Sequence, residues 1–196
     1  VPKLAFSPDS RPLAVGHGKD LNGYTATSVK LFDVATGERR QTLTHDSPVS
    51  FVDFSADGRW LLTGGENGKA YFWNGETGQE HRRFEGHSAA VTGIAQAPDG
   101  RWVATAGKDG ITRFWDTASG RELCRLIAFA DGNWAVVDPE GRFDTNALDG
   151  VGLHWIMPDD PFTPLPLEVF MRDYYEPRLL PRILTGEKLP PVRDLR

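Results

Sequence analysis

Several features are scarce or absent in this 196-residue chain, and each absence excludes a class of protein. Cysteine occurs once, so no internal disulfide can form, and Cys124 points to a reducing, cytoplasmic compartment. No apolar run approaches the roughly 18 residues that cross a bilayer, and no secretion signal follows Val1. The net charge of -5 argues against nucleic-acid or membrane binding, because both attract basic surfaces.

What the chain does contain is an internal repeat. The segments FSPDS, FSADG, QAPDG and VDPEG begin at residues 6, 54, 96 and 137, so successive copies are 48, 42 and 41 residues apart. A four-stranded blade of a β-propeller has a similar period, about 40 to 45 residues. A polar, glycine-rich insertion at residues 16–28 accounts for the longer first interval.

Each repeat divides into short strand-like segments separated by turns. In the second repeat VSFVDF, RWLLTGG, KAYFWN and QEHRRFEGH alternate with ADG, ENG and GETG. Asp-Gly and Asn-Gly favour tight hairpins because both residues tolerate positive φ. The segments between them are rich in β-branched and aromatic residues and have no helical periodicity. The pattern predicts an all-β fold of four-stranded antiparallel sheets.

The repeats resemble those of the WD-repeat β-propeller family through the ends of their third strands. Phe32-Asp33, Trp73-Asn74 and Trp115-Asp116 hold the place of the family's Trp-Asp pair, and Gly86-His87 matches its Gly-His signature. His45 stands as far before Trp73 as His87 does before Trp115. The resemblance implies a buried, hydrogen-bonded set in each blade, with Asn in place of Asp in the second set. These sets are His87, Thr105, Asp109 and Trp115, and His45, Thr63, Asn67 and Trp73.

The segment GHSAAV, residues 86–91, has a second interpretation, because it nearly matches the G-x-S-x-G elbow of serine hydrolases. An elbow serine is followed by a helix, whereas Ser88 is followed by AAVTGIAQA, which predicts a strand. We therefore favour a propeller turn in a non-catalytic protein. A serine hydrolase acting through Ser88 is the remote alternative.

No other motif predicts a catalytic, cofactor or metal site. GGENGKA, residues 64–70, departs from a phosphate-binding loop in its glycine spacing and lacks the Ser or Thr after lysine. GHGKDLNG lacks the strand-turn-helix context of a dinucleotide site, and the five histidines do not have metal-ligand spacing. Cys124 lies in a strand-like segment, where we expect a small buried hydrophobic residue rather than a nucleophile.

The fourth repeat is diverged. NWAVVDPEGRFD predicts a hairpin, and Asp149-Gly150 stands before Trp155 at the spacing of the earlier repeats. We therefore expect three full WD repeats, a diverged fourth blade and a short α-helical tail. The corresponding residues are 1–128 for the three blades, 129–160 for the fourth blade, and 161–196 for the connector, helices and linker.

The tail changes character along its length. Residues 158–166 are too rich in proline to join a central strand, so a connector is expected there. Apolar residues recur at helical spacing from Leu167 to Tyr175. A second short helix is expected over Arg178–Leu184, with Pro181 tolerated near its start and Gly186 ending it.

The tail also resembles an extension of bacterial multidomain proteins in which WD repeats accompany a caspase-like peptidase domain. The resemblance covers residues 131–185 and rests on NWAVVDPEGRFD, LHW and LEVFMRDYYEPRLLPRIL. It implies a regulatory or sensor module linked to a caspase-like effector domain. None of the 196 residues supplies the peptidase itself.

The number of repeats bears on assembly. Propellers close with about four to eight blades, and an open blade edge invites nonspecific strand pairing. We therefore expect either part of a larger propeller or a ring that a second copy completes as a homodimer.

The expected partner is a protein or peptide. Ligands of this family usually bind the face formed by the loops between blades and by the loops between second and third strands. By position, the candidate partner-binding residues are Asp46, Ser47, Glu66, Ser88, Ala89 and Lys108. Phe170 and Tyr174 are further candidates if their rings are exposed, whereas packed rings would cap the fourth blade.

Overall fold

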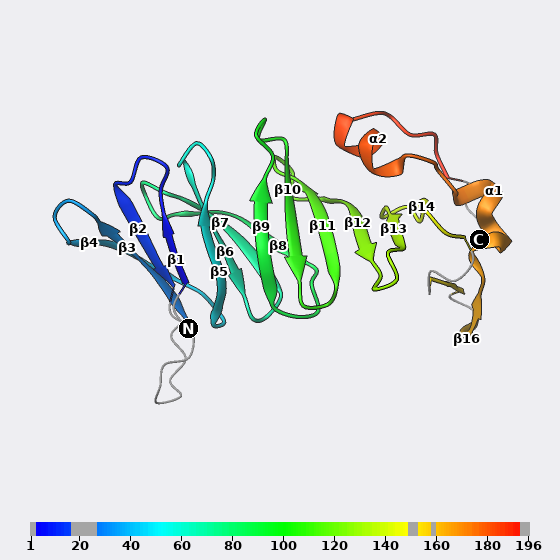
Figure 1. Ribbon diagram of the computed structural model, residues 1–196, viewed down its shortest axis with the longest axis horizontal. Coiled ribbons are helices and arrows are strands. Elements are labelled where there is room, and N and C mark those ends of the chain that lie inside the picture. The colour runs from blue at the N-terminus through cyan, green and yellow to red at the C-terminus, as the bar shows by residue number, and fades with distance from the viewer. Residues whose placement is uncertain (1–2, 17–26, 149–152, 158–159, 193–196) are drawn as a thin grey trace. The chain divides into compact units, whose positions relative to one another are not determined.

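The chain folds mainly into antiparallel strands, with short helices near its C-terminal end (Figure 1). The computed structural model describes residues 3–16, 27–148, 153–157 and 160–192. It divides into two compact units, Val1–Arg121 and Glu122–Arg196. The prediction of an all-β fold with a short helical tail is confirmed.

The first unit is built from antiparallel sheets whose strands follow chain order. The first sheet contains β1 (Lys3–Phe6), β2 (Pro12–Gly16), β3 (Ser28–Asp33) and β4 (Arg39–Thr44). The second contains β5 (Val49–Phe54), β6 (Trp60–Gly65), β7 (Lys69–Asn74) and β8 (Glu80–Glu85). The next three strands are β9 (Val91–Gln96), β10 (Trp102–Gly107) and β11 (Ile111–Asp116). Figure 1 shows the three groups of strands side by side.

The segment that marks each repeat is a tight turn between the first two strands of a sheet. In the second sheet, Asp57 accepts the Ser55 hydroxyl at 2.6 Å and the Arg59 N–H at 3.0 Å. Gly58 between them has φ of 72°, a conformation that glycine adopts without steric cost. The recurrence of this motif therefore reflects turn formation.

The core of the first unit lies between neighbouring sheets. Side chains alternate between the two faces of each strand, so both faces of the second sheet carry apolar rows. One row packs with the first sheet, and this cluster contains Ala5, Ala14, Val29, Leu31, Leu43, Val49, Val52, Phe54, Leu61, Tyr71 and Trp73. The other row packs with β9–β11, and this cluster contains Leu62, Ala70, Phe72, Phe84, Val91, Ile94, Val103 and Trp115. Each large side chain buried in this way contributes about 1.5–3 kcal/mol.

The second unit begins with three antiparallel strands, β12 (Glu122–Ala128), β13 (Trp134–Val137) and β14 (Phe143–Thr145). β13 and β14 form the hairpin expected to open a fourth blade. β12, the strand expected to end the third blade, pairs with β13 through a turn in which Gly132 has φ of 87°. An Asp131-Gly132 turn thus stands where the earlier repeats carry a histidine loop. The expected division into blades at residue 128 stays a prediction.

A separate two-stranded sheet follows, made of β15 (Trp155–Met157) and β16 (Asp160–Leu165). Trp155 was expected on the third strand of a fourth blade, and residues 158–166 were expected to be a proline-rich connector that cannot join a central strand. Residues 160–165 form a strand of this separate sheet, which proline permits because both strands of such a sheet are edges. Asp149-Gly150 and residues 17–26 of the first-repeat insertion lie outside the described residues.

The two helical predictions for the tail are confirmed. The first segment is a 3-10 turn, η1 (Leu167–Phe170), followed by one α-helical turn, α1 (Met171–Tyr174). The second is α2 (Leu179–Thr185), which ends at Gly186 with φ of 79°. Among the described helices, none has the length and apolarity that crossing a bilayer requires.

Gly68 and Gly110 occupy the same turn in successive repeats, with φ of 80° and 79°. A Cβ atom at Gly68 would lie 2.2 Å from the carbonyl oxygen of His87, whereas at Gly110 it would meet nothing within 4 Å. We expect Gly110→Ala to lower the free energy of unfolding by about 1–2 kcal/mol, the cost of a left-handed alanine. Gly68→Ala should cost about 1–3 kcal/mol more because the backbone must also move. Urea unfolding of both variants measures this difference, and equal losses would contradict the close packing of the Gly68 turn on His87.

Candidate interaction sites

The hydrogen-bonded set of the third repeat is closed in the structure. The Thr105 hydroxyl accepts the Trp115 indole N–H at 2.8 Å and lies 2.9 Å from Nε2 of His87. Nδ1 of His87 lies 2.9 Å from a carboxylate oxygen of Asp109. A hydroxyl that accepts from Trp115 donates its own hydrogen to Nε2, which leaves Nδ1–H to donate to Asp109. The set therefore joins the loop before β9 to both β10 and β11.

Asp109 also fixes the backbone of that loop. Its carboxylate accepts the Ser88 N–H and the Ile111 N–H, both at 3.1 Å. Burial acts to raise the pKa of Asp109, but these bonds and the one from His87 outweigh it and hold the pKa below its ordinary value. The carboxylate thus holds two chain segments together in its ionised form.

The set of the second repeat keeps the contacts among His45, Thr63 and Trp73 but lacks the contact between the histidine and Asn67. The Thr63 hydroxyl lies 2.7 Å from Nε2 of His45 and accepts the Trp73 indole N–H at 2.8 Å. Asn67 donates to Asp46 at 2.7 Å rather than contacting His45. Nδ1 of His45 is buried and has no hydrogen-bond partner among the described residues. Burial lowers the pKa of His45 to about 4.

Asp46 is instead the centre of an ordered polar cluster beside this loop. It accepts hydrogen bonds from Asn67, from the Lys69 ammonium at 2.8 Å and from the Tyr71 hydroxyl. The hydrogen bond from Lys69, followed by the one from Tyr71, holds the pKa of Asp46 well below its usual range. Burial, together with the bond to Asp46, raises the pKa of Tyr71 to about 12. The guanidinium of Arg83 lies 5.0 Å from the centre of the Tyr71 ring.

The candidate residues of the two loops lie on neighbouring segments. The turn at Gly68 packs on the backbone of His87 and Ala89, which brings the two loops together. Ser47 differs from the other candidates, because it is buried and its hydroxyl oxygen accepts the Asn67 N–H at 3.4 Å. The accessible candidates define what we call the loop-end surface, which consists of Asp46, Glu66, Ser88, Ala89 and Lys108.

Two residues considered for nucleophilic catalysis occupy positions that do not suit it. Ser88 is followed by the strand β9 and not by a helix, so the elbow interpretation is wrong. Cys124 is fully buried, as expected of a small hydrophobic residue. Burial raises the pKa of its thiol to about 12, which keeps the thiol protonated at neutral pH.

The aromatic candidates of the tail are packed within the second unit. The ring centres of Phe170 and Tyr174 lie 5.5 Å and 4.8 Å from that of Trp155. Phe143 and Leu167 are the buried members of the same cluster. Both candidate side chains are half-buried.

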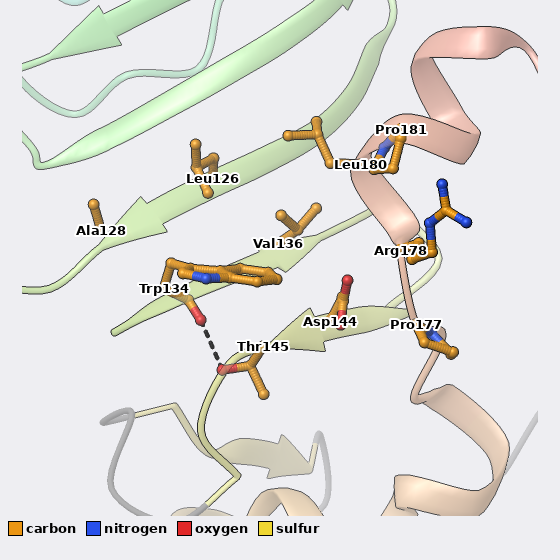
Figure 2. Close-up of a pocket in the computed structure, with 10 residues that line it drawn as sticks. All are labelled: Leu126, Ala128, Trp134, Val136, Asp144, Thr145, Pro177, Arg178, Leu180 and Pro181. Carbon is orange, nitrogen blue, oxygen red and sulfur yellow. Dashed lines mark hydrogen bonds between the residues drawn. The ribbon is translucent and has the colours of Figure 1, made fainter. Parts of the chain in front are cut away.

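The second unit also contains a pocket of about 710 Å³ that the sequence did not reveal (Figure 2). Strands β12, β13 and β14 form one side, and α2 with the segment leading into it forms the other. The lining residues are Leu126, Ala128, Trp134, Val136, Asp144, Thr145, Pro177, Arg178, Leu180 and Pro181. The hairpin NWAVVDPEGRFD was recognisable in the sequence, but nothing in it indicated that α2 would leave the sheet face partly open.

The first unit thus belongs to the class of repeat proteins built from stacked antiparallel sheets. Residues 37–74 and 78–116 match the family model of the WD domain, G-beta repeat. These two segments are WD repeats, and each joins the last strand of one sheet to the first three strands that follow. No curated protein matches the chain. WD repeats generally serve as protein-interaction scaffolds and are generally non-catalytic.

The burial of the His45 imidazole predicts a pH-dependent stability. The pKa of His45 in the folded chain is about 4, below the ordinary 6.5. Between pH 4 and pH 6.5 the unfolded chain therefore binds a proton at this histidine that the folded chain does not bind. Above pH 6.5 the group has no effect, and the free energy of unfolding should fall by about 3 kcal/mol as the pH drops from 6.5 to 4. Urea unfolding at several pH values measures the slope, and His45→Gln should flatten it. Parallel curves for both proteins would contradict the assignment.

Proposed function

We propose that the chain is a non-catalytic scaffold whose loop-end surface binds a protein or peptide partner. The observation that carries the proposal is the ordered state of this surface before any partner binds. Asp46 is 44% exposed at its side chain, yet Asn67, Lys69 and Tyr71 hold it in place. A surface ordered in advance loses little side-chain entropy on binding, and charged groups then select the partner.

We further propose that this scaffold regulates, or senses for, a larger bacterial protein with a caspase-like effector domain. What supports this context is the resemblance of residues 131–185 to extensions of such proteins. The tail packs its own aromatic rings against Trp155, so it has a defined structure that an effector could contact. The reducing compartment indicated by the single cysteine agrees with an intracellular regulator.

Reversing charge on the loop-end surface should abolish partner binding without unfolding the protein. Glu66→Lys combined with Lys108→Glu keeps the net charge and alters two exposed side chains. We expect the wild-type chain to enrich a partner from the source cells and the variant to lose that partner. The reason is that misplaced charges at an interface cost several kcal/mol. Quantitative mass spectrometry of cross-linked complexes measures the enrichment.

The matched control is Glu38→Lys combined with Arg121→Glu, which makes the same exchange of charges on turns at the opposite ends of the strands. This variant should retain the partner. The proposal fails if both variants lose it equally, or if nothing is enriched by the wild-type chain.

A second candidate function, self-assembly, is favoured by the first sheet. Leu4 and Phe6 are 62% and 59% exposed, whereas Val52 and Phe54, at the same places in the next repeat, are 7% and 8% exposed. Val52 and Phe54 are covered because they pack on the preceding sheet. Cross-strand register adds half-buried apolar neighbours to the exposed face, namely Val15 beside Leu4, Leu13 beside Phe6, and Phe32 beside Leu13. We propose that a second copy of the chain covers this face.

Light scattering across a concentration series tests the self-assembly. The wild-type chain should form a dimer near twice 21.7 kDa, and Leu4→Lys with Phe6→Lys should leave a monomer because two charges cannot be buried there. Val34→Lys, at an exposed apolar residue on a turn, is the control and should remain a dimer. A wild-type monomer at all concentrations would rule out this second function while leaving the loop-end surface untouched.

A further inference from the structure

The pocket of the second unit has an apolar wall with a single buried carboxylate. Strand register places Leu126 opposite Val136 and Val136 opposite Asp144, so these three side chains form one row across the sheet. Trp134, the neighbour of Ala128 on the next row, lies on the same face. In Figure 2, Leu180 and Pro181 face this row from α2. The volume of about 710 Å³ lies within the range of ligand pockets, about 300–1,000 Å³.

Asp144 has unused hydrogen-bonding capacity. Only 6% of the residue is exposed, and its carboxylate accepts one hydrogen bond, from the Leu179 N–H at 3.2 Å, among the described residues. A carboxylate has about four acceptor positions. A buried charge without a charged partner is unfavourable, so this group selects a ligand that brings a positive charge.

The nearest cation of the pocket does not fill this role. Arg178 lines the rim, but no ion pair joins it to Asp144, and Figure 2 shows its guanidinium directed away from the carboxylate. Arg178 is exposed, and its backbone has φ of 60°. The charge of Asp144 is therefore available to a group entering the pocket.

We propose that this pocket binds a short apolar peptide segment of a partner protein and anchors it through a lysine side chain. The four-carbon stem of lysine packs against Leu126, Trp134 and Val136, while its ammonium group reaches Asp144. Lysine fits because its ammonium is a compact charge on a flexible apolar stem, which the acceptor positions left free beside the Leu179 N–H can receive. One lysine side chain occupies only part of the volume, so flanking apolar residues fill the remainder. The site is confined to the second unit and does not depend on the loop-end surface.

Nuclear magnetic resonance of the ¹⁵N-labelled full chain tests the proposal. The probe is acetyl-Leu-Lys-Leu-amide, and the matched peptide carries norleucine, which has a similar apolar stem and no charge. The indole N–H of Trp134, identified by its loss in Trp134→Phe, reports occupancy. We expect the lysine peptide to bind about tenfold more tightly than the norleucine peptide, as a charge-assisted hydrogen bond implies.

Asp144→Asn keeps an oxygen to accept the Leu179 N–H and should remove the difference between the two peptides. If that variant does not fold, Ala128→Arg tests the location of the site from an exposed position at the pocket, because it adds a repelling charge there. Ala128→Arg should abolish binding, whereas Ala118→Arg, exposed in the first unit, should not change it.

Three results would overturn the proposal. Equal affinity for both peptides would show that Asp144 does not select a charge, and no shift with either peptide would show that the pocket does not bind this class of ligand. If n-hexylamine bound as tightly as the lysine peptide, the ligand would be a free amine rather than a peptide segment.

Discussion

A β-sheet with apolar residues on both faces needs a neighbour on each face, and the rest of the first unit depends on this constraint. The second sheet meets it, because one apolar row packs on the first sheet and the other on β9–β11. The packing is close enough to limit side-chain size at equivalent strand ends. A Cβ atom at Gly16 would lie 2.8 Å from Val52, and one at Gly64 would lie 2.9 Å from Val91. The period of the repeat is thus the length of chain needed to form one sheet and the loop that lets the next sheet pack on it.

The loop that connects one sheet to the next is held by a threonine hydroxyl that has two hydrogen-bond partners. Thr63 and Thr105 each connect the histidine of a loop to the tryptophan of a third strand. Where Asp109 is present, it completes the set and holds the loop backbone as well. In the second repeat, Asn67 takes the place of Asp109. The carboxylate there belongs to Asp46, one residue after His45, and it joins the polar cluster at the surface instead of contacting the histidine. Two differences between the repeats, Asn67 for Asp109 and Asp46 for Ser88, thus accompany the change from a buried contact to an exposed one.

The second unit shows what happens when the histidine loop is missing. An Asp-Gly turn takes its place, β12 and β13 become a hairpin, and their sheet meets α2 on one face. The short helix covers only part of that face, which leaves the pocket beside Asp144. This pocket lies outside the segments that match the WD repeat, so a function for it cannot be inherited from the family.

Much of the first unit and of its candidate surface was predictable from sequence. Turn motifs and strand periodicity are local, so the strand order, the turn at Gly58 and the helix stop at Gly186 could be predicted from neighbouring residues alone. The positions of His87, Thr105, Asp109 and Trp115 could be assigned because the family pattern sets their spacing. The burial of Ser47 and the turning of Asn67 toward Asp46 could not, because they depend on contacts across the loop.

By itself, the sequence determined the repeat, the strand class and the turns, since each depends on residues close together in the chain. Only the tertiary structure decided which apolar faces are covered, how β15 and β16 pair, and where the buried carboxylate of Asp144 lies. The physical reason is that burial and strand pairing depend on segments far apart in sequence. Leu4 and Val52 are alike as residues, yet one is exposed and the other buried, because only one of them has a sheet packed against it.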